Sequence, residues 1–154
     1  MGLGQVILAI AFAIMAFSFS GLNNLFSNQE ETVKINQIDS LANQMASLRG
    51  YVSAYGSSHP SKNGTASDNE LGLPLWFSGR DIRIKNQFNN GKGYVYCSGN
   101  CPGGLEGRLR DVTGNSLNVG HNDNGYLNVR GVKNTNITLP AAIQNGDVVY
   151  TAIN

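Results

Sequence analysis

The N-terminal segment of this chain is apolar and uncharged, and it constrains the fold more than any other feature. No charged residue lies between Leu3 and Leu22, and residues 6–17 are apolar without interruption. A helix needs about 20 such residues to cross the hydrocarbon core of a bilayer. We therefore expect residues 1–26 to form a membrane-spanning anchor. The predicted anchor residues are Val6, Ile7, Leu8, Ile10, Phe12, Ile14 and Phe17.

Two other interpretations of this segment stay open. A cleaved secretion signal would use Ser18-Phe19-Ser20 as a cleavage site of small residues, although no basic residue precedes the apolar run. A buried core helix is the third interpretation, although a core helix is usually shorter and has a polar face. The positive-inside rule decides little here, because the first charged residues are Glu30, Glu31 and Lys34.

Residues 27–56 have the pattern of an amphipathic helix that continues the apolar segment. Their apolar residues recur three and four positions apart, which places them on one side of a helix. They are Ile38, Leu41, Met45, Leu48, Val52 and Tyr55. Gly56 follows the last of them and can end the helix. One helix from residue 3 to residue 56 would be about 80 Å long.

We expect the apolar side of this helix to serve two purposes. A small sheet covers only about 20 Å of a helix, so Leu48, Val52 and Tyr55 should pack on the chain's own sheet. The residues nearer the N-terminus should extend beyond the sheet and contact helices of other proteins. These are Ile38, Leu41 and Met45, together with Val33 and Ile35. Two alternatives stay open: packing of the whole apolar side of the helix against the chain's own domain, and a coiled-coil dimer.

Residues 57–154 read as an antiparallel sheet domain with one short helix. β-branched and aromatic runs separated by turn residues predict strands at 82–88, 94–97, 116–119, 126–129, 137–139 and 148–153. Asp123-Asn124-Gly125 is a hairpin signal. The spacing of Leu105, Leu109 and Val112 predicts the helix. The fold class is therefore α+β, with a long N-terminal helix, membrane-spanning and then amphipathic, followed by a small antiparallel sheet.

Two segments before the first strand have contrasting compositions. Residues 56–69 contain Ser, His, Pro, Lys, Asn, Gly and Thr, and we expect an exposed, mobile linker. Residues 71–77 are strongly apolar, and Pro74 excludes a central strand. We expect this second segment to fill the core as a short turn, with Trp76 and Phe77 buried.

Cys97 and Cys101 enclose Ser98-Gly99-Asn100, a turn that can bring the two thiols within bridging distance. We expect a disulfide, with free thiols and a metal or redox site as the alternatives. A disulfide favours an oxidising compartment, so we expect the N-terminus in the cytoplasm and the C-terminal domain outside.

The composition and motifs exclude several classes of function. The formal charge is +1 and charged residues make up 14% of the chain, against about 25% in typical soluble domains. We therefore expect no nucleic-acid binding, although four bases could form a weak patch: Arg80, Arg83, Lys85 and Lys92. The chain has no GxSxG, HExxH, P-loop or helix-opening GxGxxG pattern. Glu106 should pair with Arg110 on a solvated helix face, and His121 should be exposed beside a hairpin turn. We expect no enzyme, no catalytic, cofactor-binding or metal residue, and no small-molecule substrate.

Five segments carry a family resemblance through their order and spacing. They are Leu71–Phe77 (LGLPLWF), Gly91–Tyr96 (GKGYVY), Ser116–Gly120 (SLNVG), Leu139–Ile143 (LPAAI) and Gly146–Val149 (GDVV). With the apolar N-terminus, they make the chain similar to the PilM family of plasmid-type type IVb pilus operons. These small envelope proteins are needed for the thin pilus that assists conjugation in liquid. The resemblance implies a non-enzymatic component of type IVb pilus biogenesis, with other pilus-system proteins as partners through the N-terminal helix.

The predicted architecture also resembles a type IV pilin, in which a long N-terminal helix precedes an antiparallel sheet. Gln5 stands where major pilins carry a glutamate, and the chain has no basic leader that ends in glycine. We expect a minor-pilin-like or accessory protein, anchored by a single pass in the bacterial inner membrane with its C-terminal domain in the periplasm. A secreted or periplasmic binding module with a cleaved N-terminal signal is the alternative.

Overall fold

The computed structural model describes the backbone of residues 3–132 and 135–152, and the side chains in those ranges from residue 30 onward. The chain forms two compact units, Met1–Gln37 and Ile38–Asn154. One long helix and a small antiparallel sheet make the fold α+β, as the sequence predicts.

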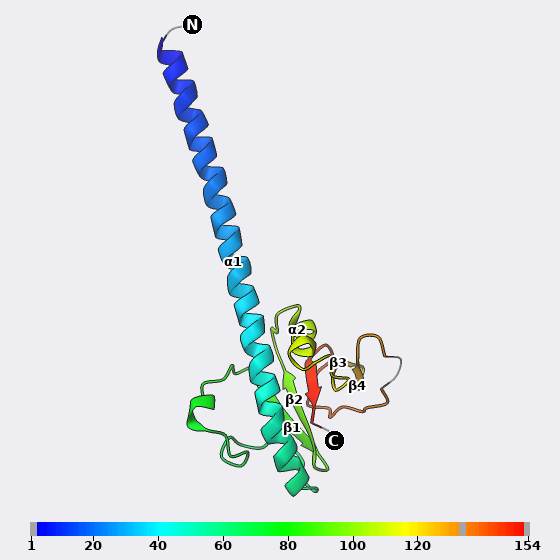
Figure 1. The fold of residues 1–154 in the computed structure, drawn as a ribbon. Helices are drawn as coiled ribbons and strands as arrows, with labels where there is room; N and C mark the ends of the chain where they lie inside the picture. The colour runs from blue at the N-terminus through cyan, green and yellow to red at the C-terminus, as the bar shows by residue number, and fades with distance from the viewer. Residues whose placement is uncertain (1–2, 133–134, 153–154) are drawn as a thin grey trace. The chain divides into compact units, whose positions relative to one another are not determined.

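Helix α1 runs from Leu3 to Ser58 without interruption (Figure 1). It continues through Gly50, in keeping with the absence of any proline before residue 60. Within the described residues, no helix carries an apolar stretch long enough to cross a membrane. The predicted anchor residues lie outside the side chains that the structure describes; they are Val6, Ile7, Leu8, Ile10, Phe12, Ile14 and Phe17.

The sheet has five strands in the spatial order β1-β2-β5-β3-β4, and every neighbouring pair is antiparallel. The strands are β1 (Ile84–Asn89), β2 (Lys92–Cys97), β3 (Val119–Asp123), β4 (Tyr126–Asn128) and β5 (Val148–Thr151). Two shorter helices complete the fold, the 3-10 turn η1 (Leu75–Phe77) and α2 (Leu105–Val112). The predicted short helix is therefore confirmed.

Two tight hairpins order the strands. Asn90 and Gly91 join β1 to β2 with φ values of 49° and 73°, and Asn124 and Gly125 join β3 to β4 with 52° and 87°. Two consecutive residues with positive φ are the signature of a type I′ turn, which matches the twist of the strands. The hairpin turn predicted at Asp123-Asn124-Gly125 is confirmed.

The strand predicted at 137–139 is wrong, since only Thr138 makes a single bridge, to Tyr126. Asn136 has a φ of 54°, and Pro140 has no N–H to donate, so the segment cannot continue a regular ladder. The strand predicted from residue 116 begins only at Val119.

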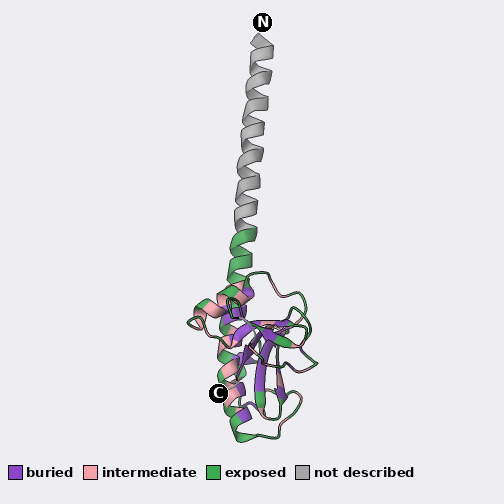
Figure 2. Cartoon of the chain, turned by 90° about the vertical axis from the view of Figure 1, so that its right-hand side faces the viewer, coloured by how far each residue is buried: buried purple, intermediate pink, exposed green. Residues whose placement is uncertain are grey.

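Apolar residues cover both faces of the sheet, and Figure 2 shows the buried residues concentrated in the strands. One face packs against α1 and α2 through Leu41, Met45, Leu48, Val52, Leu105 and Leu109. The other face is covered by the chain after β4 and holds Tyr94, Tyr96, Leu127, Val129, Leu139, Ile143 and Val149. Helices, sheet and loop thus form three layers around two cores.

Several predicted core residues are confirmed. Leu48 and Val52 are fully buried, and Phe77 is 5% exposed. Tyr55 is half-buried, and its ring meets Phe88 of β1 edge-on at 5.4 Å between centroids. Gly93 of β2 permits the close approach of α1, because a Cβ at this position would collide with Cγ1 of Val52.

The partner contacts predicted at Leu41 and Met45 are wrong, because both side chains are buried in the chain's own core. The sequence-based prediction assumed that only the sheet packs on α1, and it therefore placed Leu41 and Met45 beyond the core. Helix α2 packs beside the sheet, so the core extends along α1 past the sheet to Leu41. An ion pair between Arg108 Nε and Asp39 Oδ1, at 2.7 Å, also joins α2 to α1. Ile38 is half-buried, with its Cδ1 close to Gly104 just before α2.

The predicted burial of Trp76 is also wrong, since its side chain is 75% exposed. Successive residues in a 3-10 helix point about 120° apart. The η1 turn therefore directs Phe77 into the core and Trp76 away from it.

The segment predicted as a mobile linker, 56–69, is partly held along β1. Gly64 and Phe88 exchange two backbone hydrogen bonds, at 2.7 and 3.1 Å. The buried side-chain amide of Asn86 accepts a hydrogen bond from Ala66 N and donates one to Ala66 O. Ala66 is itself buried.

Candidate interaction surface

Several charged side chains of the domain form pairs with one another. Within the described residues, no group of three His, Cys, Asp or Glu side chains could hold a metal ion. The predicted pair of Glu106 with Arg110 is wrong, since Glu106 contacts His121 Nδ1 at 2.8 Å, which joins α2 to β3. Arg110 instead donates to the backbone oxygen of Arg130. His121 is therefore half-buried rather than exposed.

Two of the four bases that could form a weak patch, Arg80 and Arg83, are paired with acidic residues. Arg80 Nη1 lies 2.7 Å from Asp68, and this hydrogen bond lowers the pKa of the Asp68 carboxyl. Arg83 holds both carboxylate oxygens of Asp81, and its side-chain hydrogen bonds lower the pKa of Asp81 to about 2. Each arginine thus has an acidic partner in this part of the chain.

Three large apolar side chains stand out on the segment between α1 and β1. Leu75 is 92% exposed, Trp76 is 75% exposed and Ile82 is 91% exposed. We call these three residues the η1 surface. Contiguous exposed apolar patches mark protein contact sites, and these three side chains lie on one loop of the chain.

The segment that carries the η1 surface is fixed at several points. The Gln44 side chain of α1 accepts a hydrogen bond from Asp81 N at 2.8 Å. Phe77 is inserted in the core, and the ion pair of Arg80 with Asp68 closes the loop. Side chains offered from a fixed loop lose less conformational entropy on binding than those of a mobile one.

A groove of about 270 Å³ lies beside Trp76. Helix α1 supplies one wall with Asn43, Gln44 and Ser47, and the loop supplies Trp76, Phe77, Gly79 and Arg80. A partner side chain that entered the groove would meet the indole of Trp76 together with neutral polar groups of α1.

A second exposed apolar pair lies on α1, where Val33 is 66% and Ile35 is 52% exposed. The sequence predicts these two residues as available to a partner, and their exposure agrees. Of the predicted partner-helix contacts, Ile38 is partly covered, and Leu41 and Met45 are buried.

The disulfide predicted between Cys97 and Cys101 is present in the structure. It joins the end of β2 to the loop that precedes α2. Arg83 Nη1 donates to the backbone oxygen of Asn100 inside this small ring. The bond therefore fixes the connection on which α2 is placed against the core.

Sequence reasoning missed the η1 surface because it assigned residues 71–77 to the core and Ile82 to a strand, whereas β1 begins only at Ile84. A signal was present in the sequence. Ile82 lies between Asp81 and Arg83, and both charges need contact with solvent or with each other. These charges indicate that the segment around Ile82 lies at the surface. Pro74 directly before three apolar residues is also typical of a tight turn, whose residues cannot all point inward.

Comparison with known proteins identifies relatives. The model of the PilM family matches residues 12–151. A chain described as PilM from Escherichia coli B7A is similar in structure, with a TM-score of 0.58 and 22% identity over 76% of this chain and 92% of that one. A chain described as PilM from Pseudomonas aeruginosa 2192 has a TM-score of 0.47 and 32% identity over 75% of this chain and 94% of that one. No curated protein matches the sequence.

Proposed function

Since the chain belongs to the PilM family, we propose that it is a non-enzymatic component of type IVb pilus biogenesis. The family model covers nearly the whole sheet domain and much of α1, so the proposal concerns the whole chain rather than one segment. The protein acts by binding other components of the pilus system. Its role is that of a minor-pilin-like subunit or a membrane-anchored accessory protein that supports conjugation in liquid.

The observation that carries this proposal is the η1 surface. Leu75, Trp76 and Ile82 expose large apolar area at fixed positions, although Phe77 and Leu71 of the same segment are buried. Tryptophan, tyrosine and arginine are the residues that most often dominate the binding energy of protein interfaces, so Trp76 is the principal residue of this surface. The η1 surface therefore forms the contact with a pilus-system partner. Val33 and Ile35 leave α1 in different directions and are available to other helices.

The location in the proposal rests on the sequence of residues 1–26 and on the disulfide. The apolar segment anchors the chain in the inner membrane, and the domain lies in the periplasm, where disulfides form and persist. N-terminal sequencing of the protein from the membrane fraction tests this location. An intact first residue supports the anchor, whereas a start at Gly21 would identify a cleaved signal and contradict it.

Complementation of a deletion strain tests the role of the η1 surface. A triple variant, Leu75→Ser with Trp76→Ala and Ile82→Ser, should reduce pilus-dependent transfer in liquid by about tenfold or more, because hot-spot residues each contribute about 2 kcal/mol. The variant protein should accumulate and unfold like the wild type, since all three side chains are exposed.

Leu117→Ser is the matched control, because Leu117 is also exposed but lies in the loop before β3. This control should leave transfer unchanged. Wild-type transfer in the triple variant, at normal protein levels, would remove the η1 surface from the proposal.

A further inference from the structure

Four Asn-Gly sequences in this chain have the chemistry of a spontaneous modification. In such a sequence the backbone nitrogen of the glycine can attack Cγ of the asparagine side chain. A new C–N bond forms, and the side-chain nitrogen leaves as ammonia with the proton of the glycine nitrogen. Water then opens the cyclic imide to aspartate or isoaspartate. Glycine favours the attack because it has no Cβ in the way. All four asparagines are exposed; they are Asn63, Asn90, Asn124 and Asn145.

The turn of the β1–β2 hairpin is braced by an Asn-Gly sequence of the loop after α1. Asn63 Oδ1 accepts a hydrogen bond from Asn90 N at 2.9 Å, and Gly91 N donates to Lys62 O at 3.0 Å. Gly64 N donates to a backbone oxygen of β1 at 3.1 Å. The glycine nitrogens of both sequences, one in the hairpin and one in the loop, are therefore engaged as donors.

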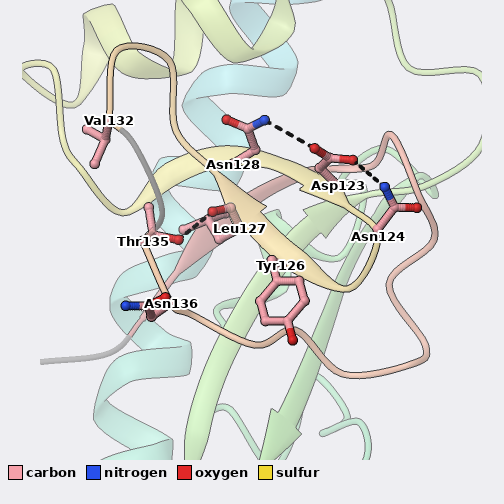
Figure 3. Close-up of a pocket in the computed structure, with 8 residues that line it drawn as sticks. All are labelled: Asp123, Asn124, Tyr126, Leu127, Asn128, Val132, Thr135 and Asn136. Carbon is pink, nitrogen blue, oxygen red and sulfur yellow. Dashed lines mark hydrogen bonds between the residues drawn. The ribbon is translucent and has the colours of Figure 1, made fainter.

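The turn of the β3–β4 hairpin is braced in the same way by the loop before β5. Asn145 Oδ1 accepts from Asn124 N at 2.8 Å, and Gly146 N donates to Asn122 O at 2.8 Å. Gly125 N donates to the side-chain oxygen of the buried Asn122, also at 2.8 Å. Figure 3 shows Asn124 at this turn, with its side-chain amide hydrogen-bonded to the neighbouring aspartate. The two hairpins thus share one arrangement, in which a loop asparagine holds a hairpin asparagine.

These hydrogen bonds oppose the modification at its first step. The glycine nitrogen must give up its proton and turn toward Cγ of the asparagine, and a hydrogen bond from its N–H to an oxygen holds it against both changes. The reaction therefore requires local opening, and its rate falls with the population of the open form. In each hairpin, the bond to the loop asparagine lies next to the glycine that has to be released.

We propose that the four asparagines are modification sites that the fold holds closed, and that Asn63 and Asn145 hold closed the hairpin sites Asn90 and Asn124. When a hairpin opens, its asparagine converts to aspartate or isoaspartate. Isoaspartate lengthens the backbone by one carbon atom, so the type I′ turn and the strand register that depends on it are not regained. The chain thereby keeps a covalent record of each opening. These sites are independent of the η1 surface.

Peptide mapping by mass spectrometry measures the conversion at each site. The full-length protein in detergent is incubated in mildly alkaline buffer, in one sample folded and in the other unfolded with guanidinium chloride. Each of the four sites should convert at least about tenfold more slowly in the folded sample, because reaction there waits for local opening. Equal rates in the two samples would overturn the proposal.

Asn63→Ala and Asn145→Ala test the two braces, and each variant is the control for the other. Asn63→Ala removes the acceptor for Asn90 N, so conversion of Asn90 in the folded protein should become about threefold faster or more, whereas Asn124 should keep its wild-type rate. Asn145→Ala should accelerate Asn124 and leave Asn90 unchanged. Asn63→Asp keeps an acceptor oxygen at this position, so Asn90 should stay slow.

Both substituted residues are exposed, so the variants should fold, and circular dichroism verifies this. If a variant does not fold, the comparison of folded and unfolded wild type decides. The proposal is overturned if a folded variant leaves the rate at its own hairpin unchanged. It is also overturned if either variant accelerates Asn90 and Asn124 equally, since the opening would then be global rather than local to one brace.

Discussion

Trp76 and Phe77 are consecutive residues whose ring centroids lie 5.5 Å apart with an interplanar angle of 81°, yet one ring faces solvent and the other fills the core. Phe77 therefore contributes to stability, whereas its neighbour Trp76 is available for binding. Phe77→Ala should lower the free energy of unfolding by about 3–5 kcal/mol, because it leaves a cavity in a packed core.

Trp76→Ala is the matched variant for Phe77→Ala and should change stability by less than about 0.5 kcal/mol. Chemical denaturation of both variants measures the difference. Equal destabilisation by the two changes would show that the indole packs on the domain in solution.

Gly93 and Gly50 give a second matched pair. Gly93→Ala should destabilise the domain by about 1–3 kcal/mol, because the new methyl group would collide with Val52 of α1. Gly50 lies on α1, where a methyl group added to its Cα would have no neighbouring atom within 4 Å outside the helix's own backbone. Gly50→Ala should therefore stabilise the helix by about 0.5–1 kcal/mol. Thermal unfolding followed by circular dichroism distinguishes the two signs, and a shift of the same sign in both variants would contradict the packing described for Gly93.

Removal of the disulfide should have a moderate cost. The loop closed by Cys97 and Cys101 is short, so the entropy argument gives about 2 kcal/mol. The double variant Cys97→Ala with Cys101→Ala, compared with the wild type by urea unfolding without reductant, measures this cost. Intact mass before and after alkylation verifies the bond in the wild type, and two alkylated thiols in the unreduced protein would refute it.

Acid should weaken the loop that carries the η1 surface. The pKa of Asp81 falls from its ordinary value of 3.8 to about 2 through its hydrogen bonds with Arg83. Because the folded value is the lower one, the contribution to stability is complete above pH 3.8 and is lost as the pH falls through about 2. The unfolding free energy of Asp81→Asn should therefore depend less on pH in this window than that of the wild type.

Asp111→Asn serves as the control for the acid experiment, because Asp111 is exposed and has no ion pair among the described residues. Asp147 acts in the opposite direction, since burial raises the pKa of its carboxyl. Protonation of Asp147 therefore favours the folded state at low pH. If the unfolding free energy of the wild type rises as the pH falls, the contribution of Asp147 is larger than that of Asp81.

The elements that sequence predicts well here are those with local causes. Helix α1 follows from a long stretch without proline, and the two hairpins follow from Asn-Gly pairs that readily adopt positive φ. The pairing of Cys97 with Cys101 is similarly local, since a short glycine-containing turn brings the two residues together.

The errors concern contacts between distant segments. The spacing of Leu41 and Met45 shows which side of α1 is apolar, but not that α2 covers it. Apolar composition alone cannot separate Trp76 from Phe77, because the turn geometry decides which of them points inward. The bridge between Thr138 and Tyr126 likewise depends on a later segment that folds back to the β3–β4 hairpin.

Both edges of the sheet are engaged by other parts of the same chain. Gly64 and Ala66 cover β1 through Phe88 and Asn86, and Leu127 of β4 donates to the backbone oxygen of Ile137. A partner that tried to add a strand to the sheet would find the hydrogen-bonding positions at Phe88 and Leu127 taken. Strand addition is therefore hindered at these two positions, which also lowers the tendency of neighbouring copies to join edge to edge there.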